Sequence, residues 1–305
     1  MLSLMLLTLT GCGNIYAKEA VTKETESKLS VETAGKIVAE DHIPETERTA
    51  EDKESEEQDS DYVTEGTENY HDFVVDSILH SYEFGDIHYC VFIPDGYDGS
   101  KAYSLYITLP GYQGLYFQGA AMNIRTEKFG FEAQNYRDDM IILAPQLEDW
   151  GETSAKKTIA LTEYFLEHYN IDRELVYISG YSGGGETLSL VLDSCPELYT
   201  AALMCSSQWD GGYQAVVDAK IPVYFVTGES DEYYGPEPFD KAYREIRSLY
   251  EAEGLSETEI DHFVVLDIKP AAYFTDRGVT HQHGGGGGLF SRDSEIMGWL
   301  FGEHK

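Results

Sequence analysis

The chain has 305 residues, 42% of them hydrophobic, which is enough for one large domain or two small ones with a sizeable core. Its formal net charge of −34 disfavours binding to nucleic acid or to an acidic membrane surface, because both carry negative charge. The four cysteines match no zinc-binding spacing, so we expect neither a metal nor another cofactor.

The first residues are typical of an export signal. Residues 1–10 are almost wholly apolar but too few to span a bilayer as a helix. The ending Leu9-Thr10-Gly11-Cys12 resembles the lipobox of bacterial lipoproteins, although no Lys or Arg precedes the apolar run. That resemblance implies a signal segment over residues 1–12 and a protein outside the cytoplasm, held to the membrane only by a lipid on Cys12. A plain secretory signal, giving a secreted protein, or a short buried strand is the alternative.

Residues 13–70 are dominated by Glu, Asp, Lys, Ser and Thr, with sparse and aperiodic apolar residues. Such a composition buries too little surface to offset chain entropy, so we expect a disordered acidic linker with at most a short helix around Val31–Val38. The folded domain is expected over residues 71–305. Within this domain Cys195 and Cys205 either form a disulfide or stay free thiols, and the sequence does not fix which.

The folded part begins with strand patterns and continues with alternating strands and helices. That alternation favours an α/β fold whose central sheet is mostly parallel, has about eight strands and carries helices on both faces. The expected strands are Phe73–Phe84, Asp86–Pro94, Ser104–Leu109, Met140–Ala144, Leu175–Ile178, Ala201–Cys205, Ile221–Thr227 and Phe263–Ile268. The expected helices are Thr153–His168, Glu186–Leu192, Pro238–Ala252 and Leu289–Phe301.

A Gly-rich turn separates the strand Leu175–Ile178 from the following helix and reads Gly180-x-Ser182-x-Gly184. This is the pattern of a nucleophile elbow, in which a strained serine stands at the end of a strand and the glycines avoid collisions of a Cβ atom. An acid and a histidine follow later strands in the order typical of α/β-hydrolases. Residues 71–305 therefore resemble the α/β-hydrolase family, which implies that fold and makes Ser182 the nucleophile.

The acid follows the strand Ile221–Thr227. Asp231 lies where the family places the carboxylate that orients the base histidine, with Glu229, Glu232 and Asp240 as competitors. The base lies in Thr280-His281-Gln282-His283-Gly284. We prefer His283, which adjoins the run Gly284–Gly288, and keep His281 as the alternative.

Two backbone amides are expected to form the oxyanion hole, which binds the negative oxygen of the tetrahedral intermediate. By the resemblance they are the N–H groups of Gly183 and of Tyr112, with Gln113 behind it. Pro110-Gly111 replaces the His-Gly that is frequent in the family. Trp209 follows another strand end and is expected either to form an aromatic wall with Tyr112 or to pack as a large aromatic residue at the domain edge.

These features predict a serine hydrolase, most simply a carboxylic ester hydrolase that acts on a small or polysaccharide-linked ester. The chain resembles small extracellular esterases and also catalytic domains of prolyl-oligopeptidase type, so a propeller-free serine peptidase is the first alternative. A catalytically inactive binding module on the same scaffold is the second, because a fold does not dictate a function.

Overall fold

A computed structural model of the protein describes residues 60–112, 118–302 and 304. The predicted export signal, Cys12 and the segment around Val31–Val38 lie outside these residues, as does Gln113. The described residues form a unit that opens at Ser60. No helix within them has the length and apolar content needed to cross a bilayer.

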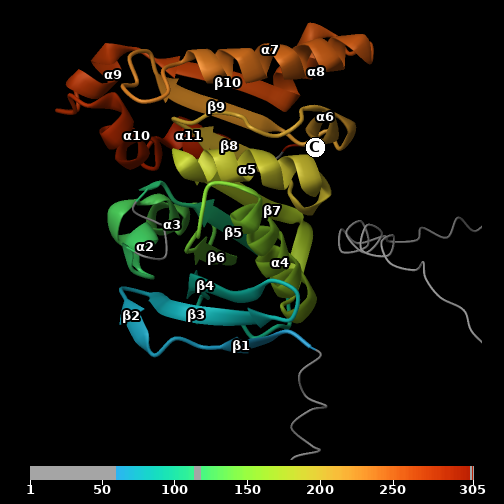
Figure 1. Ribbon diagram of the computed structural model, residues 1–305, viewed down its shortest axis with the longest axis vertical. Helices are drawn as coiled ribbons and strands as arrows, with labels where there is room; N and C mark the ends of the chain where they lie inside the picture. Colours follow the sequence, from blue (N-terminus) through green and yellow to red (C-terminus); the bar gives the residue numbers. More distant parts are fainter. Residues whose placement is uncertain (1–59, 113–117, 303, 305) are drawn as a thin grey trace, which may run out of the picture. The chain divides into compact units, whose positions relative to one another are not determined.

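Ten strands form one mixed sheet, in the order β1-β3-β4-β6-β5-β7-β8-β9-β10, with β2 paired to β3 (Figure 1). The strands are β1 Tyr62–Thr64, β2 Glu68–Tyr70, β3 Phe73–Ser81, β4 Gly85–Phe92, β5 Tyr103–Leu109, β6 Met140–Pro145, β7 Ile171–Tyr181, β8 Ala201–Cys205, β9 Val223–Gly228 and β10 Val264–Lys269. Neighbours from β6 to β10 pair in parallel, whereas β1 to β4 pair antiparallel with their neighbours. The expected parallel sheet is confirmed, with two more strands and an antiparallel edge.

The burial of the strands explains this division. β5, β6, β8 and β9 are buried along their whole length, as expected of parallel strands covered on both faces. β3 alternates strictly between buried and half-buried residues, which fits an antiparallel strand with one wetter face. The six parallel strands bring their carboxyl ends to one edge of the sheet, where ligand sites form in such folds.

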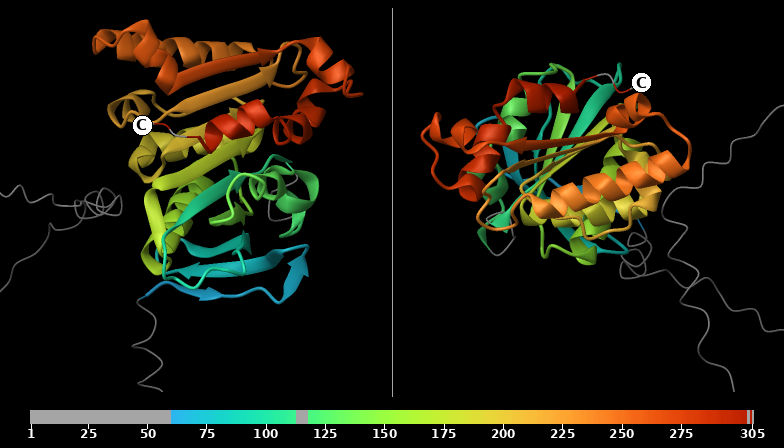
Figure 2. Two further views of the ribbon diagram at one scale, coloured as in Figure 1. Left: turned by 180° about the vertical axis from the view of Figure 1, so that it is seen from behind. Right: turned by 90° about the horizontal axis from the view of Figure 1, so that it is seen from above.

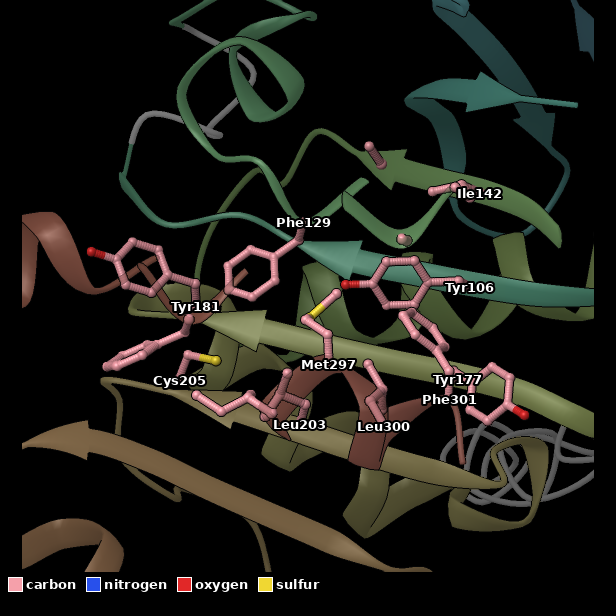
Figure 3. Close-up of a cluster of buried hydrophobic side chains, with 14 of the residues drawn as sticks. Tyr106, Phe129, Ile142, Tyr177, Tyr181, Leu203, Cys205, Met297, Leu300 and Phe301 are labelled. Carbon is pink, nitrogen blue, oxygen red and sulfur yellow. The ribbon is translucent and has the colours of Figure 1, made fainter. Parts of the chain in front are cut away.

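Helices lie on both faces of the sheet. They are α2 Met122–Thr126, α3 Phe129–Ala133, α4 Glu152–His168, α5 Gly183–Ser194, α6 Gln214–Asp218, α7 Glu237–Ala252, α8 Glu257–Phe263, α9 Ala271–Thr275, α10 Gln282–Phe290 and α11 Ser294–Leu300. Figures 1 and 2 show α4, α5 and α7 over one face and α3 and α11 over the other. The face under α11 is rich in aromatic residues: the Phe301 ring meets those of Tyr106 and Tyr177 edge-on, and Phe129 packs in the same core (Figure 3).

Two expectations are corrected, and one open question, the Cys195–Cys205 disulfide, is answered. The fold begins at Ser60 rather than at residue 71, since β1 and β2 pair with β3; these three-residue edge strands are largely exposed and lack the apolar alternation that would reveal them. The helix expected over Leu289–Phe301 is two helices, because Asp293 caps a new one by accepting the Glu295 N–H at 3.0 Å. Cys205 is a free, buried thiol, so no Cys195–Cys205 disulfide forms.

Candidate active site

The turn after β7 has the geometry of a nucleophile elbow. Ser182 has φ 54° and ψ −126°, a strained conformation for a residue with a side chain. Its N–H donates to the Cys205 carbonyl at 2.9 Å, which ties the turn to β8. Such strain persists only when the surroundings hold it, and it frequently marks functional sites.

The glycines around Ser182 are required by close packing, as the sequence predicted. A Cβ on Gly180 would lie 2.5 Å from the Gly184 carbonyl oxygen, and one on Gly184 would lie 2.5 Å from those of Leu109 and Pro110. A Cβ on Gly183 would lie 2.4 Å from the Trp150 ring. The elbow helix α5 therefore presses against the loop after β5, with the ring of Trp150 beside its first residue.

Ser182, His283 and Asp231 are brought together from three segments of the chain. The Ser182 Oγ atom is 3.0 Å from His283 Nε2, and His283 Nδ1 is 3.0 Å from Asp231 Oδ2. The Asp231 carboxylate is fully buried, and the His283 side chain is 15% exposed. Burial alone would raise the pKa of Asp231, but hydrogen bonds from His283 and from the Tyr234 N–H outweigh it and lower the pKa to about 2. Asp231 is thus ionised at neutral pH and can orient and stabilise an imidazolium.

His281 does not reach Ser182. It is the N-cap of α10, where its Nδ1 accepts the Gly284 N–H at 2.9 Å, and its side chain is 65% exposed. Glu232, a competitor for the acid position, accepts the N–H groups of Gln282 at 3.0 Å and His283 at 2.9 Å. These two residues hold the start of the helix that carries His283.

The glycine run that follows His283 is helical rather than a loop. Residues Gly284–Gly288 lie inside α10, and the run packs closely on its surroundings. A Cβ on Gly287 would lie 3.2 Å from the Tyr181 ring, and one on Gly285 would lie 2.3 Å from Val279. The Tyr181 hydroxyl also donates to the His283 carbonyl. The missing side chains let α10 approach β7 closely enough to bring His283 to the elbow.

A cavity of about 480 Å³ opens over Ser182 and His283. Its described lining includes five aromatic side chains and two acidic ones, namely Tyr112, Trp150, Tyr181, Tyr233 and Tyr234 with Glu127 and Glu186. Burial raises the pKa of Glu186, although the Tyr234 hydroxyl donates to its Oε1 at 2.6 Å and opposes that shift. No Lys or Arg is among the described lining residues.

Both predicted oxyanion residues line this cavity: Gly183 opens α5 next to Ser182, and Tyr112 follows β5 with a 61% exposed side chain. Trp209 does not line it. Trp209 is 8% exposed, donates from Nε1 to the Gly212 carbonyl at 3.2 Å and packs against Phe225. The expected aromatic wall therefore contains Tyr112 but not Trp209, which packs inside the domain.

Sequence reasoning assigned no role to six of these lining residues, namely Trp150, Tyr181, Tyr233, Tyr234, Glu127 and Glu186. Trp150 comes shortly after β6, whose carboxyl end faces the same edge as β7, so the strand-end rule could have suggested it. Tyr234 and Glu186 come shortly after Asp231 and Ser182, yet nothing in their spacing marks them. Glu127 belongs to a region where the sequence predicted no element.

One protein-family model and several solved structures resemble the chain. Residues 146–258 match the model of the prolyl oligopeptidase family, a range that includes Ser182 and Asp231 and ends before His283. No curated protein matches the chain in sequence.

Solved structures share the fold. A thermostable esterase superposes with a TM-score of 0.61 at 23% identity over 76% of this chain and 63% of its own. The fluorophosphonate-binding serine hydrolase F of Staphylococcus aureus gives 0.52 at 11% identity over 76% of this chain and 98% of its own. Oligopeptidase B from Leishmania major gives 0.50 at 13% identity over 75% of this chain and 37% of its own.

This chain thus spans less than two thirds of the length of the thermostable esterase and of oligopeptidase B. At these identities the likeness concerns the fold. Taken with the family match over residues 146–258, it shows that the described part of the chain has the α/β-hydrolase fold.

Proposed function

We propose that the protein hydrolyses carboxylic esters through an acyl-enzyme on Ser182. The observation that carries this proposal is the continuous hydrogen-bonded line from the Ser182 Oγ atom through His283 to the buried Asp231. A serine hydroxyl is a weak nucleophile until a base removes its proton, and His283 Nε2 lies within hydrogen-bond distance to do so.

In the first half of the reaction, Ser182 attacks the ester carbonyl while His283 takes the hydroxyl proton. Asp231 stabilises the resulting imidazolium, and the N–H groups of Gly183 and Tyr112 bind the negative oxygen. His283 then returns the proton to the leaving alcohol. In the second half, His283 activates water, which releases the acid and restores Ser182.

A peptide substrate is the second candidate, and a specific observation favours it: residues 146–258 match the prolyl oligopeptidase family. The likeness in fold to the thermostable esterase and to a fluorophosphonate-binding hydrolase supports the ester. The two candidates share Ser182, His283 and Asp231, so only substrates distinguish them.

The test is a panel of nitrophenyl esters and aminoacyl-prolyl amides, read together with covalent labelling by a fluorophosphonate. We expect ester turnover and labelling in the native chain. Ser182→Ala and His283→Ala should each lower kcat by about 10⁶-fold, as single triad losses do. His281→Ala is the matched control and should stay within about tenfold, because that residue only caps α10.

Three outcomes would change the proposal. Turnover of amides without esters would favour the peptidase. Retention by His283→Ala with loss in His281→Ala would reassign the base. Absence of both labelling and turnover in the native chain would favour the inactive binding module.

We also propose that the protein acts outside the cytoplasm, anchored through Cys12. The support is the apolar run of residues 1–10 followed by Leu9-Thr10-Gly11-Cys12. Metabolic labelling with a fatty-acid analogue should modify the native chain and not Cys12→Ala. Equal labelling of both, or of neither, would contradict the anchor.

A further inference from the structure

Glu127 is a buried carboxyl group beside the nucleophile that the proposed reaction does not use. It is 6% exposed and lines the same cavity as Ser182. Its Oε1 atom accepts the Gly111 N–H at 2.6 Å. Its Oε2 atom has no hydrogen-bond partner among the described residues. A buried carboxyl group with only one of its two oxygens hydrogen-bonded destabilises the fold. Its presence beside the nucleophile therefore indicates a functional role.

The sheet holds Glu127 in place. Glu127 directly follows α2, whose buried Asn123 donates from Nδ2 to the carbonyls of Thr108 at 3.0 Å and Pro145 at 3.3 Å. These carbonyls belong to the ends of β5 and β6, so α2 is tied to the carboxyl edge of the sheet. The carboxyl group of Glu127 therefore reaches the loop after β5 from an anchored helix.

Gly111 is confined between Glu127 and the nucleophile. A Cβ on Gly111 would lie 3.2 Å from Glu127 Oε1 and 3.3 Å from Ser182 Cβ, so both atoms flank the same point. The preceding carbonyls, those of Leu109 and Pro110, rest against Gly184 of the elbow helix. The loop after β5 is thus held by α5 on one side and by Glu127 on the other. The held residue, Gly111, directly precedes Tyr112 in the chain.

The charge of Glu127 matters at this position. Burial raises its pKa to about 8, although the Gly111 N–H opposes that shift, so the group is neutral at pH 7. The titratable groups that sense its charge are Tyr106 on β5, Tyr181 on β7 and Cys205 on β8. Burial raises the pKa of all three, so none of them ionises near pH 8. Two further titratable groups, His283 on α10 and Glu186 on α5, line the same cavity.

We propose that Glu127 is a positioning residue for the oxyanion: from its anchored helix it holds the Gly111 N–H, and with it the adjacent Tyr112 N–H, beside the nucleophile. The inference rests on the proposed ester hydrolysis. An ionised Glu127 still accepts the Gly111 N–H, but it repels the negative oxygen that forms on the substrate. Turnover therefore falls as Glu127 loses its proton.

The test compares Glu127→Gln and Glu127→Ala with the native protein, using a nitrophenyl ester followed at the isosbestic wavelength of the product. Glu127→Gln keeps an acceptor for Gly111 but cannot ionise. Glu127→Ala removes the acceptor. Glu259→Gln is the matched control, because Glu259 also accepts one backbone N–H, that of Ser256 at 2.8 Å, on the exposed start of α8. Ser182→Ala gives the spontaneous background at each pH.

We expect kcat of the native protein and of Glu259→Gln to fall as the pH rises through about 8, to which burial raises the pKa of Glu127. Glu127→Gln should remain within about threefold of the native kcat at pH 7 and lose that alkaline decline. Glu127→Ala should lose about 100-fold in kcat with KM little changed, as a misplaced oxyanion donor does. The pH profile of Glu127→Gln can be measured even if Glu127→Ala does not fold. Either variant alone can therefore test the inference.

An alkaline decline that persists in Glu127→Gln would overturn the inference while leaving the proposed function intact, and so would an unchanged kcat in a folded Glu127→Ala. A native protein that neither turns over the ester nor reacts with a fluorophosphonate would overturn both. The two failures are therefore distinguishable in one set of measurements.

Discussion

Replacing Glu127 by glutamine should make the protein's stability less sensitive to alkali. The folded protein holds this carboxyl with a pKa of about 8, against 4.5 for an ordinary glutamate. Between these values the folded state binds a proton that the unfolded state has released, so stability falls as the pH rises. The stabilising contribution of the neutral acid is complete below about pH 4.5 and is lost as the pH passes through about 8.

The magnitude follows from the same two values. One unit of pKa corresponds to about 1.36 kcal/mol, so the free energy of unfolding of Glu127→Gln relative to the native protein should rise by about 4 kcal/mol from pH 5 to pH 9. At pH 5 the variant should be less stable by about 1–3 kcal/mol, because its amide N–H groups take the place of the Oε2 atom, for which the described residues offer no hydrogen-bond partner. The sign of the difference should therefore reverse within this range.

The assay is equilibrium unfolding in urea at pH 5, 7 and 9, followed by tryptophan fluorescence and circular dichroism on the same samples. Coincident transitions justify a two-state treatment. Glu259→Gln is again the control, since hydrogen bonds from Ser256 lower the pKa of Glu259 and leave it ionised over the whole range. A difference between Glu127→Gln and the native protein that stays constant with pH would refute the reasoning.

Three further results are expected. Asp231→Asn should lower kcat by about 10⁴-fold, because the base loses the carboxylate that selects its tautomer; activity near the native level would remove Asp231 from the triad. Trp209→Ala should cost about 3–5 kcal/mol of unfolding free energy with KM unchanged, whereas Trp150→Ala should raise KM, since only Trp150 lines the cavity; the reverse pattern would contradict this placement. A succinate half-ester should have kcat/KM about tenfold below that of a neutral butyrate ester, because the described lining holds Glu186 but no Lys or Arg to pair with the carboxylate of the substrate; equal values in a competition assay would exclude this charge selectivity.

The sequence was most informative where a structural feature depends on residues that are close together in the chain. The elbow could be interpreted from sequence because its Gly-x-Ser-x-Gly pattern is local and Gly180 is only a few residues from Gly184, the residue that its Cβ would meet. The contacts of Gly183 with Trp150 and of Gly184 with Leu109 are distant in the chain and became visible only in the structure. The buried parallel strands were equally visible, since continuous apolar runs mark them. Edge strands β1 and β2 were missed because exposed strands carry no such run.

The sequence by itself determined the order of Ser182, Asp231 and the two candidate histidines along the chain, the alternation of strands with helices, and the acidity of the protein. Only the tertiary structure shows that His283 rather than His281 lies within hydrogen-bond distance of Ser182, because that placement depends on how closely a glycine-rich helix packs on Tyr181. The same holds for Glu127: its carboxyl group meets Gly111 through an anchored helix and loses its solvation there. Contacts of this kind join segments with no pattern in common, and burial, which sets the protonation of the group, exists only in the folded chain.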